Sequence, residues 1–530
     1  MRKFFIIFLH SSFIFLIGTS CTPQNLPAII ALTGTPTESN PSQTPFVPAS
    51  PSNGPTPTPS LTPVNLPESP LPTLTPIPSE TAAPSPTPIP PALSNVEGPQ
   101  YLLDVTVHYD AHRLDVTQQI SYTNDTGQKL DTFILAIVPN QTSGVFELGQ
   151  LTIDDKTPAK LNLTGQKLEI NLTKPLAPGG TAIIKMNYRI NLPAAMQGDP
   201  NIVRPAIFGY TSRQTNLTDW YPMIVPYNPE TGWVLPTPWL FGEHLVYPRA
   251  DFDIILRFSD AIPPTVASSG APQIIDSLTH YILENGRAFA FSFSRDYQTA
   301  SAEVEGVTIT SYYFPILNNS GQAALDDTVK AYKTYSGMFG PYHHKTLSVV
   351  QGDFNDGMEF DGLYFLSNAF YNLYDGTQKN YLAVVAVHET CHQWWFGRVA
   401  SDQAAEPWLD ESIATYCEKL FYENNYPDLV PWWWSYRIDF YQPSGYIDLP
   451  VDETGGFTPY MNAIYRMGAH FYEDLRIFIG DDAFFTFLLD YSTQMDGKIA
   501  SSDDFFRILR SHTDKDLSPL LADYFKNPNR

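Results

Sequence analysis

The sequence predicts a multidomain protein in which an all-β N-terminal domain is followed by an α+β, mainly helical domain. Between residues 101 and 300, apolar and polar residues alternate with a period of two, which is the pattern of half-buried strands. From about Val307 onward, the apolar spacing becomes that of helices. The chain has 530 residues, 14% of them aromatic, which is enough material for two or more cores.

Residues 1–21 are typical of a secretory leader. Two basic residues precede an apolar run from Phe4 to Ile17 that is too short and too interrupted to span a bilayer. The small residues before Cys21 resemble the lipobox of bacterial lipoproteins, although Gly18 stands where that pattern usually has leucine. We expect lipidation of Cys21 and anchoring to the outer face of a bacterial cell membrane. The alternative is ordinary cleavage nearby and secretion.

Residues 22–99 are rich in proline, threonine and serine and hold 22 of the chain's 48 prolines. A segment of this composition has almost no apolar material for a packed core, so we expect a disordered, extended linker. The leader and the linker together predict that the rest of the chain is exported.

Residues 100–303 form the predicted β domain. Four segments alternate most clearly, and turn sequences such as NDTGQK and LAPGG separate them; the segments are YLLDVTVHYD, LDVTQQISYTN, TAIIKMNYRINL and DFDIILRF.

Residues 304–530 form the second predicted domain, a short mixed sheet followed by helices. The apolar spacing predicts a strand at 345–351 and helices at 323–339 and around 380–397, 408–424, 461–478 and 482–492. No repeat of solenoid or propeller period is present.

The formal net charge of −24 argues against nucleic acid as a partner. Beyond Cys21 the chain has only Cys391 and Cys417, which is too few for a disulfide framework. We expect both to be small buried side chains and Cys391 to belong to the core rather than to a metal site. A single bridge between them is the alternative.

The segment VAVHETCHQWWFG carries the most specific chemistry. Asn380 is a suitable N-cap and Gly397 a suitable end for a helix here. On a helix, His388 and His392 lie on one face and can direct ring nitrogens at one metal ion. Glu389 lies on the adjoining flank, where a general base can reach a metal-bound water. The alternative interpretation is a buried helix that carries two histidines by chance.

A third ligand distinguishes these interpretations. Catalytic zinc takes three protein ligands and leaves a position for water, and a carboxylate from a second helix is one standard third ligand. The segment EPWLDESIATYCEKLFYE begins an apolar-striped helix, and 18 residues separate its Glu411 from His392. The pattern therefore favours a zinc site over a chance pair of histidines.

The combination of H-E-x-x-H, 18 residues and a glutamate within W-L-x-E resembles the signature of the aminopeptidase N family of zinc metallopeptidases. The resemblance implies a thermolysin-like catalytic domain and one Zn²⁺ per chain, held by His388, His392 and Glu411. It also implies that Glu389 acts as the general base on a zinc-activated water.

Two further motifs resemble those of the same family. DGMEFDG resembles G-x-M-E-N, an edge strand whose glutamate, here Glu359, holds the free amino terminus of a substrate. This chain has Asp356 where the family has glycine and Phe360 where it usually has asparagine, which puts the backbone contacts of this strand in doubt. AIYRMGA resembles the family's Y-x-x-G-A helix, so Tyr465 corresponds to the tyrosine that faces the oxyanion; its alternative is a core tyrosine.

The resemblance extends from about Tyr101 to the end of the chain, because TDWYPMIVPYNPETGW and the segments after it look like the family's N-terminal domain. The large helical C-terminal domain of many members has no counterpart, so we expect a short form with a more open cleft.

We therefore expect an exported zinc metallopeptidase that acts on peptide substrates, in the first place an aminopeptidase. An endopeptidase of the same fold is one alternative, because the motif around Glu359 is altered. A surface binding protein without catalysis is another, of a different class. No residue supports the epoxide hydrolase activity of one family branch.

Overall fold

The computed structural model describes residues 98–195, 207–315 and 318–528. The predicted leader, the lipidation site at Cys21 and the linker lie outside the described residues. Residues Thr87–Arg530 form one compact unit. Within the described ranges, no helix combines the length and the apolar character needed to cross a membrane.

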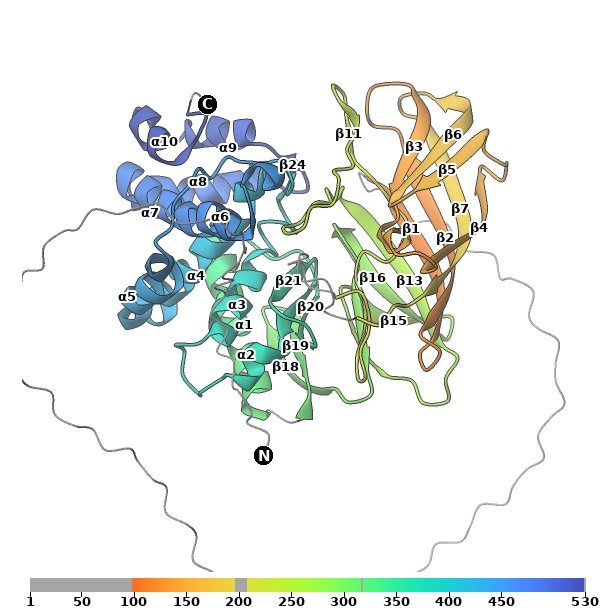
Figure 1. Ribbon diagram of the computed structural model, residues 1–530, viewed down its shortest axis with the longest axis horizontal. Helices are drawn as coiled ribbons and strands as arrows, with labels where there is room; N and C mark the ends of the chain where they lie inside the picture. The colour runs from red at the N-terminus through yellow and green to blue at the C-terminus, as the bar shows by residue number, and fades with distance from the viewer. Residues whose placement is uncertain (1–97, 196–206, 316–317, 529–530) are drawn as a thin grey trace, which may run out of the picture. The chain divides into compact units, whose positions relative to one another are not determined.

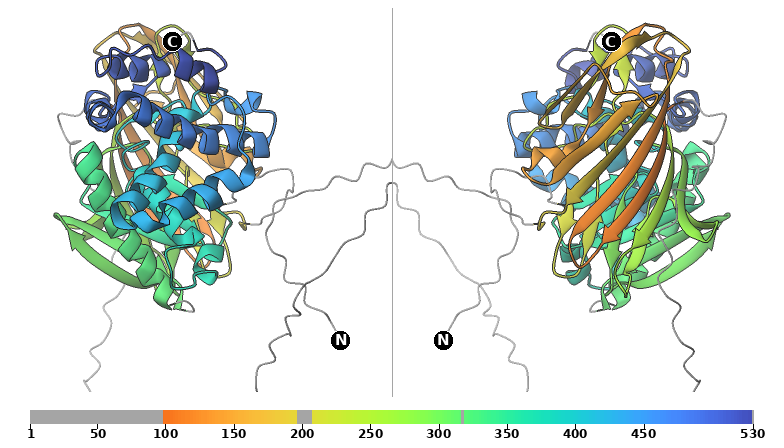
Figure 2. Two further views of the ribbon diagram at one scale, coloured as in Figure 1. Left: turned by 90° about the vertical axis from the view of Figure 1, so that its left-hand side faces the viewer. Right: turned by 90° about the vertical axis from the view of Figure 1, so that its right-hand side faces the viewer.

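A seven-stranded sheet in the order β15-β16-β13-β1-β2-β7-β4 dominates the N-terminal domain (Figure 1). Its strands are β1 (Gln100–His108), β2 (Arg113–Thr123), β4 (Phe146–Ile153), β7 (Thr181–Asn191), β13 (Ala250–Phe258), β15 (Ala271–Ile275) and β16 (Leu278–Gly286). Alternate residues of β1, β2 and β7 are buried, as the period of two predicts. The right-hand view of Figure 2 looks onto the broad face of this sheet.

Smaller sheets complete the β domain. One has the order β10-β3-β6-β5, and its strands are β3 (Leu130–Ala136), β5 (Lys160–Thr164), β6 (Lys167–Leu176) and β10 (Met223–Ile224). Another has the order β14-β17-β9-β8, and its strands are β8 (Gly209–Tyr210), β9 (Thr215–Leu217), β14 (Thr265–Ser268) and β17 (Phe291–Ser294). A short hairpin joins β11 (Tyr227–Asn228) to β12 (Gly232–Trp233).

The second domain opens with a five-stranded mixed sheet in the order β18-β19-β20-β22-β21. Its strands are β18 (Gln298–Val304), β19 (Val307–Tyr313), β20 (Thr346–Gly352), β21 (Gly357–Phe360) and β22 (Leu363–Ser367). The predicted boundary between residues 303 and 304 falls at the end of β18, which pairs with β19 and so belongs to this sheet. β21 pairs with β22 alone and is an edge strand.

One helix lies between β19 and β20 of this sheet, and the others follow the sheet, as the sequence predicts. They are α1 (Asn318–Phe339), α2 (Asn368–Asn372), α3 (Tyr381–Cys391), α4 (Glu411–Asn425), α5 (Val430–Trp433), α6 (Phe457–Tyr460), α7 (Gly468–Ile479), α8 (Asp481–Gln494), α9 (Ser502–Leu509) and α10 (Ser518–Tyr524). Two π-helical segments, η5 (Trp434–Ile438) and η8 (Met461–Met467), interrupt the later helices. α3 packs against α1, α4 and the sheet, which explains why ten of its eleven residues are buried.

The predicted start of α3 at Asn380 is confirmed, and its predicted end at Gly397 is wrong. The Asn380 side chain accepts a hydrogen bond from the Ala383 N–H and caps the helix. The helix ends at Cys391 rather than near Gly397. Beyond it the chain turns tightly, which brings the Trp395 carbonyl to within 3.0 Å of His392 Nδ1. His392 nevertheless keeps a helical backbone, and its N–H donates to the His388 carbonyl.

The expectation of two free thiols is wrong. Cys391 of α3 and Cys417 of α4 form a disulfide, with their Cα atoms 6.3 Å apart. Because the two helices pack directly on each other, both sulfur atoms lie in the buried interface between them.

Candidate metal centre and active site

Three side-chain atoms converge where α3 meets the first turn of α4. Nε2 of His388 lies 3.1 Å from Nε2 of His392 and 3.2 Å from Oε2 of Glu411, and His392 Nε2 lies 3.6 Å from that oxygen. Ligands about 2.0–2.1 Å from a tetrahedral zinc ion are separated by about 3.3 Å, so this triangle has the size of one face of a zinc site. The spacing of four residues and the 18-residue interval predicted this convergence.

The charges around the triangle favour a bound cation. Burial alone would lower the pKa of His388, but hydrogen bonds with Glu411 and Glu418 outweigh it and raise the pKa to about 9. Burial would raise the pKa of Glu411, but both histidines hold it well below its ordinary value. The protein groups thus stabilise positive charge between the ring nitrogens and the carboxylate, and a metal ion can take the place of the protons there.

His388 is held through its second ring nitrogen. Its Nδ1 lies 3.0 Å from Oε1 of Glu418, which is fully buried. Trp433 Nε1 donates to the same carboxylate, and Arg437 binds it with two hydrogen bonds of 3.0 and 2.9 Å. This network fixes the ring so that Nε2 faces the centre of the triangle.

His392 is held in the same way by Asp410. Its Nδ1 lies 2.7 Å from Oδ1 of Asp410, and the other oxygen of Asp410 accepts a 2.7 Å hydrogen bond from Gln403. Gln403 Nε2 also lies 3.1 Å from Oε1 of Glu359. A chain of hydrogen bonds therefore connects His392 to Glu359, the residue expected to bind a substrate's amino terminus.

The sequence analysis did not identify Glu418 or Asp410 as orienting residues. A signal was present for Glu418, because it follows Glu411 by seven residues and so lies on the same helix face. Asp410 directly precedes Glu411, and nothing in its spacing distinguishes it from a helix-capping aspartate.

Glu389 of α3 lies beside the triangle and packs against β21. Its Oε1 is so close to Gly357 of β21 that a Cβ atom there would lie 2.2 Å from it. Its Oε2 is buried and has no hydrogen-bond partner among the described residues. Burial raises the pKa of Glu389 to about 8, with His388 and His392 acting in the opposite direction. A carboxylate with these properties can accept a proton near neutral pH.

Glu359 lies on β21, as the sequence predicts for an edge strand beside the cleft. The strand is fixed to the end of α3 by Gln393, which donates to the Phe360 carbonyl at 3.1 Å and accepts from the Gly362 N–H at 2.9 Å. The unpaired edge of β21 offers backbone groups to an extended peptide. Burial raises the pKa of Glu359 well above its ordinary value.

Tyr465 lies on the π-helical segment η8, a type of segment that is frequent at functional sites. Its ring is stacked on that of His388, with centroids 6.0 Å apart. Burial, followed by the negative charge of Glu411, raises its pKa well above the ordinary value, so the hydroxyl keeps its proton. Gly468 explains this placement, because a Cβ there would lie 2.1 Å from Oγ of Ser412; only glycine lets η8 and α7 approach α4 so closely.

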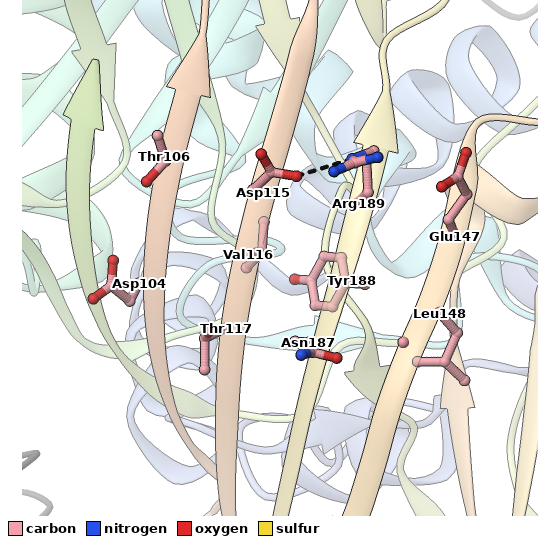
Figure 3. A pocket seen from close by; sticks show the side chains of 11 residues that line it. Asp104, Thr106, Asp115, Val116, Thr117, Glu147, Leu148, Asn187, Tyr188 and Arg189 are labelled. Carbon is pink, nitrogen blue, oxygen red and sulfur yellow. Dashed lines mark hydrogen bonds and ion pairs between the residues drawn. The ribbon is translucent and has the colours of Figure 1, made fainter. Parts of the chain in front are cut away.

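A separate depression of about 560 Å³ lies on the β domain (Figure 3). Its lining comes from β1, β2, β4 and β7, and it contains an ion pair between Asp115 and Arg189. No residue of the α3 and α4 site contributes to it. The depression belongs to the outer face of the seven-stranded sheet, and the chemistry described above lies elsewhere.

Comparison with known proteins gives a consistent result. Residues 323–524 match the model of the peptidase family M1 domain. Aminopeptidase N of Lactobacillus helveticus is 27% identical over 313 residues, which cover 53% of this chain and 36% of the relative. Aminopeptidase M1-B of Oryza sativa subsp. japonica is 25% identical over 238 residues, which cover 42% of this chain and 27% of the relative. The matches thus span only about a third of these relatives.

The fold is similar to that of solved structures. The M1 zinc metallopeptidase from Deinococcus radiodurans superposes with a TM-score of 0.57 at 18% identity, covering 78% of this chain and 90% of that one. A variant of that enzyme, bound to a Tyr-Ser-Ala substrate, gives a TM-score of 0.56 at 18% identity and covers 78% and 91%. The likeness confirms a β-rich N-terminal region followed by a helical peptidase domain.

A β-rich domain followed by this helical domain and a three-ligand metal centre define the fold class of a two-domain zinc metallopeptidase. The second domain is thus similar to the domain of the peptidase M1 family, to which the aminopeptidase N relatives correspond. Its cofactor is one zinc ion, and the donor set of two imidazole nitrogens and one carboxylate fits that ion.

Proposed function

We propose that this protein is a zinc-dependent aminopeptidase that removes residues from the free amino terminus of peptides. The observation that carries the proposal is the position of Glu359. This buried carboxylate is joined to zinc-ligand His392 through Gln403 and Asp410, and it lies on an edge strand that also contacts Glu389. A peptide amine bound at Glu359 places its first peptide bond near Glu389.

The substrate is held as an extra strand. β21 has one unpaired edge, and a peptide lying along it forms backbone hydrogen bonds without regard to side-chain identity. The carboxylate of Glu359 then pairs with the protonated amine, and the hydrogen bond from Gln403 keeps that carboxylate in place. The peptide is thus bound by its amino-terminal end.

Zinc, when bound by His388, His392 and Glu411, supplies Lewis-acid activation of the attacking water and of the scissile carbonyl. Glu389 accepts a proton from that water through Oε2, the oxygen without a protein partner, and delivers it to the departing amine. The hydroxyl of Tyr465 donates a hydrogen bond to the oxygen on which negative charge develops. Its raised pKa keeps this donor protonated at neutral pH.

The test is a side-by-side assay of one peptide with a free and with an acetylated amino terminus, using zinc-loaded protein. We expect the free peptide to lose its first residue and the acetylated one to be a poor substrate. Glu359→Ala should lower cleavage of the free peptide by at least about 100-fold, since it leaves the substrate's cation without its partner. Glu389→Gln should keep one zinc per chain and abolish turnover.

Equal cleavage of both peptides at internal bonds would replace the aminopeptidase with an endopeptidase. A zinc-loaded protein that cleaves neither peptide would instead favour a binding protein without catalysis. Metal analysis separates this last result from a failure to load zinc.

The cellular location is a second part of the proposal. The basic start, the apolar run and the small residues before Cys21 support export and a lipid anchor at that cysteine. Mass spectrometry of the mature amino terminus tests it. A diacylglyceryl group on Cys21 is expected, and an unmodified terminus elsewhere would indicate simple secretion.

A further inference from the structure

One carboxylate at the edge of the active-site cleft has no part in the mechanism above. Asp356 directly precedes β21 and has φ 80°, a left-handed backbone conformation that non-glycine residues rarely adopt. Its side chain is exposed. The carboxylate accepts one hydrogen bond, through Oδ1, from the N–H of Gly357. Oδ2 has no hydrogen-bond partner among the described residues.

Asp356 lies next to the chemistry. The following residue, Gly357, is the one that Glu389 contacts through Oε1. Desolvation raises the pKa of Asp356, and the charges of His388 and Glu411 also act on it. The charge of Asp356 in turn acts on Glu389. Its carboxylate therefore lies within electrostatic reach of the scissile bond.

The nearest cation does not neutralise it. Arg437 acts on Asp356 electrostatically, but it forms no ion pair with it among the described residues and binds Glu418 instead, through Nε and Nη2 at 3.0 and 2.9 Å. Glu418 and Arg437 thus form a neutral buried pair. Asp356 is thus an exposed carboxylate without a salt-bridge partner among the described residues.

Aromatic rings lie near the same cation. Tyr381 interacts electrostatically with Arg437, its hydroxyl lies 3.2 Å from that of Tyr441, and its ring contacts that of Tyr436 at 5.7 Å. Tyr436 is 45% exposed. Asp356 acts on the same cation, and aromatic rings together with a carboxylate suit a side chain that has an apolar stem and a positive end.

The order of residues along β21 indicates which part of a bound peptide lies beside Asp356. Glu359 takes the amine, and Gly357 adjoins the base that acts at the scissile bond. Each residue of a strand advances by about 3.3 Å, so Gly357 lies about 7 Å along the strand from Glu359, and Asp356 directly precedes Gly357. Asp356 therefore lies beside the residues that follow the scissile bond.

We propose that Asp356 forms an anionic subsite on the leaving-group side, which selects peptides with lysine or arginine at one of the two positions after the scissile bond. The ammonium or guanidinium group pairs with the free oxygen of Asp356, Oδ2. This inference rests on the proposed function only for the direction in which the peptide lies.

The test measures binding, so that it does not depend on turnover. The protein is the zinc-loaded Glu389→Gln variant. The first pair of probes is Ala-Lys-Ala-Phe and Ala-norleucine-Ala-Phe, and the second pair is Ala-Ala-Lys-Phe and Ala-Ala-norleucine-Phe. Norleucine has the stem of lysine without its charge. By calorimetry, the lysine peptide of at least one pair should bind about three to ten times more tightly than its norleucine partner.

Adding Asp356→Asn should reduce this ratio to within about twofold. Asparagine keeps the shape and tolerates the left-handed backbone, so the change removes only the charge. Asp356→Gly is the second variant, should the first fail to fold or to load zinc. Asp523→Asn is the matched control, because it removes an exposed carboxylate on α10, and it should leave the ratio unchanged.

Equal binding of lysine and norleucine peptides at both positions would overturn the subsite. So would a lysine preference that survives both Asp356 variants. The proposed function fails separately, if wild-type zinc-loaded protein leaves all four peptides uncleaved while the binding ratios are still measurable.

Discussion

Each histidine of the proposed zinc site is held by a carboxylate at the nitrogen that faces away from the triangle. Glu418 holds His388 and Asp410 holds His392, at 3.0 and 2.7 Å. These contacts fix the tautomer and the ring plane and make the free nitrogen more basic. Zinc affinity should therefore depend on residues that do not touch the ion.

Glu418→Gln should lower zinc affinity by about 10- to 100-fold, because the amide orients His388 less strongly and lacks the negative charge. The measurement is a competition titration against a chelator of known affinity. Glu423→Gln is the matched control. It lies on the same helix and also binds an arginine, Arg476, with two hydrogen bonds, but it does not contact a histidine. Equal zinc affinity of both variants would make Glu418 a merely structural residue.

Tyr465→Phe should lower kcat by about 100- to 1000-fold with little change in KM, since its hydroxyl acts mainly on the developing oxyanion. Tyr472→Phe provides the comparison, because it removes another buried tyrosine hydroxyl, on α7, that has no hydrogen-bond partner among the described residues. Steady-state kinetics on one peptide measure both. Similar kcat values for the two variants would mean that Tyr465 has only a packing role, in the aromatic cluster it forms with Tyr460.

At the scale of elements, α3 and α4 act as one unit. α3 supplies His388, α4 supplies Glu411, and the disulfide between Cys391 and Cys417 joins the two helices. The bridge limits how far the helices can separate and so supports the geometry of the triangle.

Replacing both cysteines by alanine should lower the free energy of unfolding by about 3 kcal/mol, the value expected for a bridge that closes a loop of 26 residues. Chemical denaturation of the zinc-loaded variant measures this. Wild-type protein treated with a reductant should approach the stability of the variant. If the variant unfolded at the same denaturant concentration as the oxidised wild type, the bridge would contribute no stability.

The elements that the sequence predicted are those whose pattern is local. Alternation of apolar residues identified β1, β2, β7 and β13, and Asn380 marked the start of α3. The convergence of His388, His392 and Glu411 was also predicted, because helix geometry and a fixed interval bring them together. The end of α3 was not, since the turn after Cys391 depends on the contact between His392 and the Trp395 carbonyl.

Features that depend on packing between distant segments escaped prediction. The pairing of two cysteines depends on how closely α3 approaches α4, and composition says nothing about that distance. The π-helical form of η8 likewise follows from its close contact with α4 at Gly468 and Ser412. Helical periodicity in 461–478 predicted a helix there but not its local widening.

At the scale of the molecule, the β domain positions the loop that leads into β21. Arg213 binds Asp353 through its Nε at 3.1 and 2.9 Å, and Gln214 donates to the Gln351 carbonyl and accepts from the Asp353 N–H. Asp353 is only three residues before Asp356. The β domain therefore helps to set the position of β21 beside the proposed zinc site, although it provides none of the three converging side chains.

The stability of the whole molecule should fall as the pH rises, in part because of one buried carboxylate. Asp327 of α1 has a side chain that is 1% exposed, and its salt-bridge partner Lys330 is 3.9 Å away. Burial raises the pKa of Asp327 from 3.8 to about 7. Between these two values the folded state retains a proton that the unfolded state has released, so the free energy of unfolding decreases as pH rises through that window.

Asp327→Asn removes this penalty, so the gain in stability relative to wild type should be larger at pH 8 than at pH 5.5. Denaturant unfolding of zinc-loaded proteins at the two pH values gives the difference directly, because contributions from other titrating groups cancel between variant and wild type. Asp326→Asn serves as the control, since it removes an exposed charge from the same helix and so separates burial from a change in net charge. A gain from Asp327→Asn that is equal at both pH values would mean that Asp327 is already ionised at pH 5.5. The Lys330 ammonium would then stabilise the buried carboxylate more strongly than its 3.9 Å distance indicates.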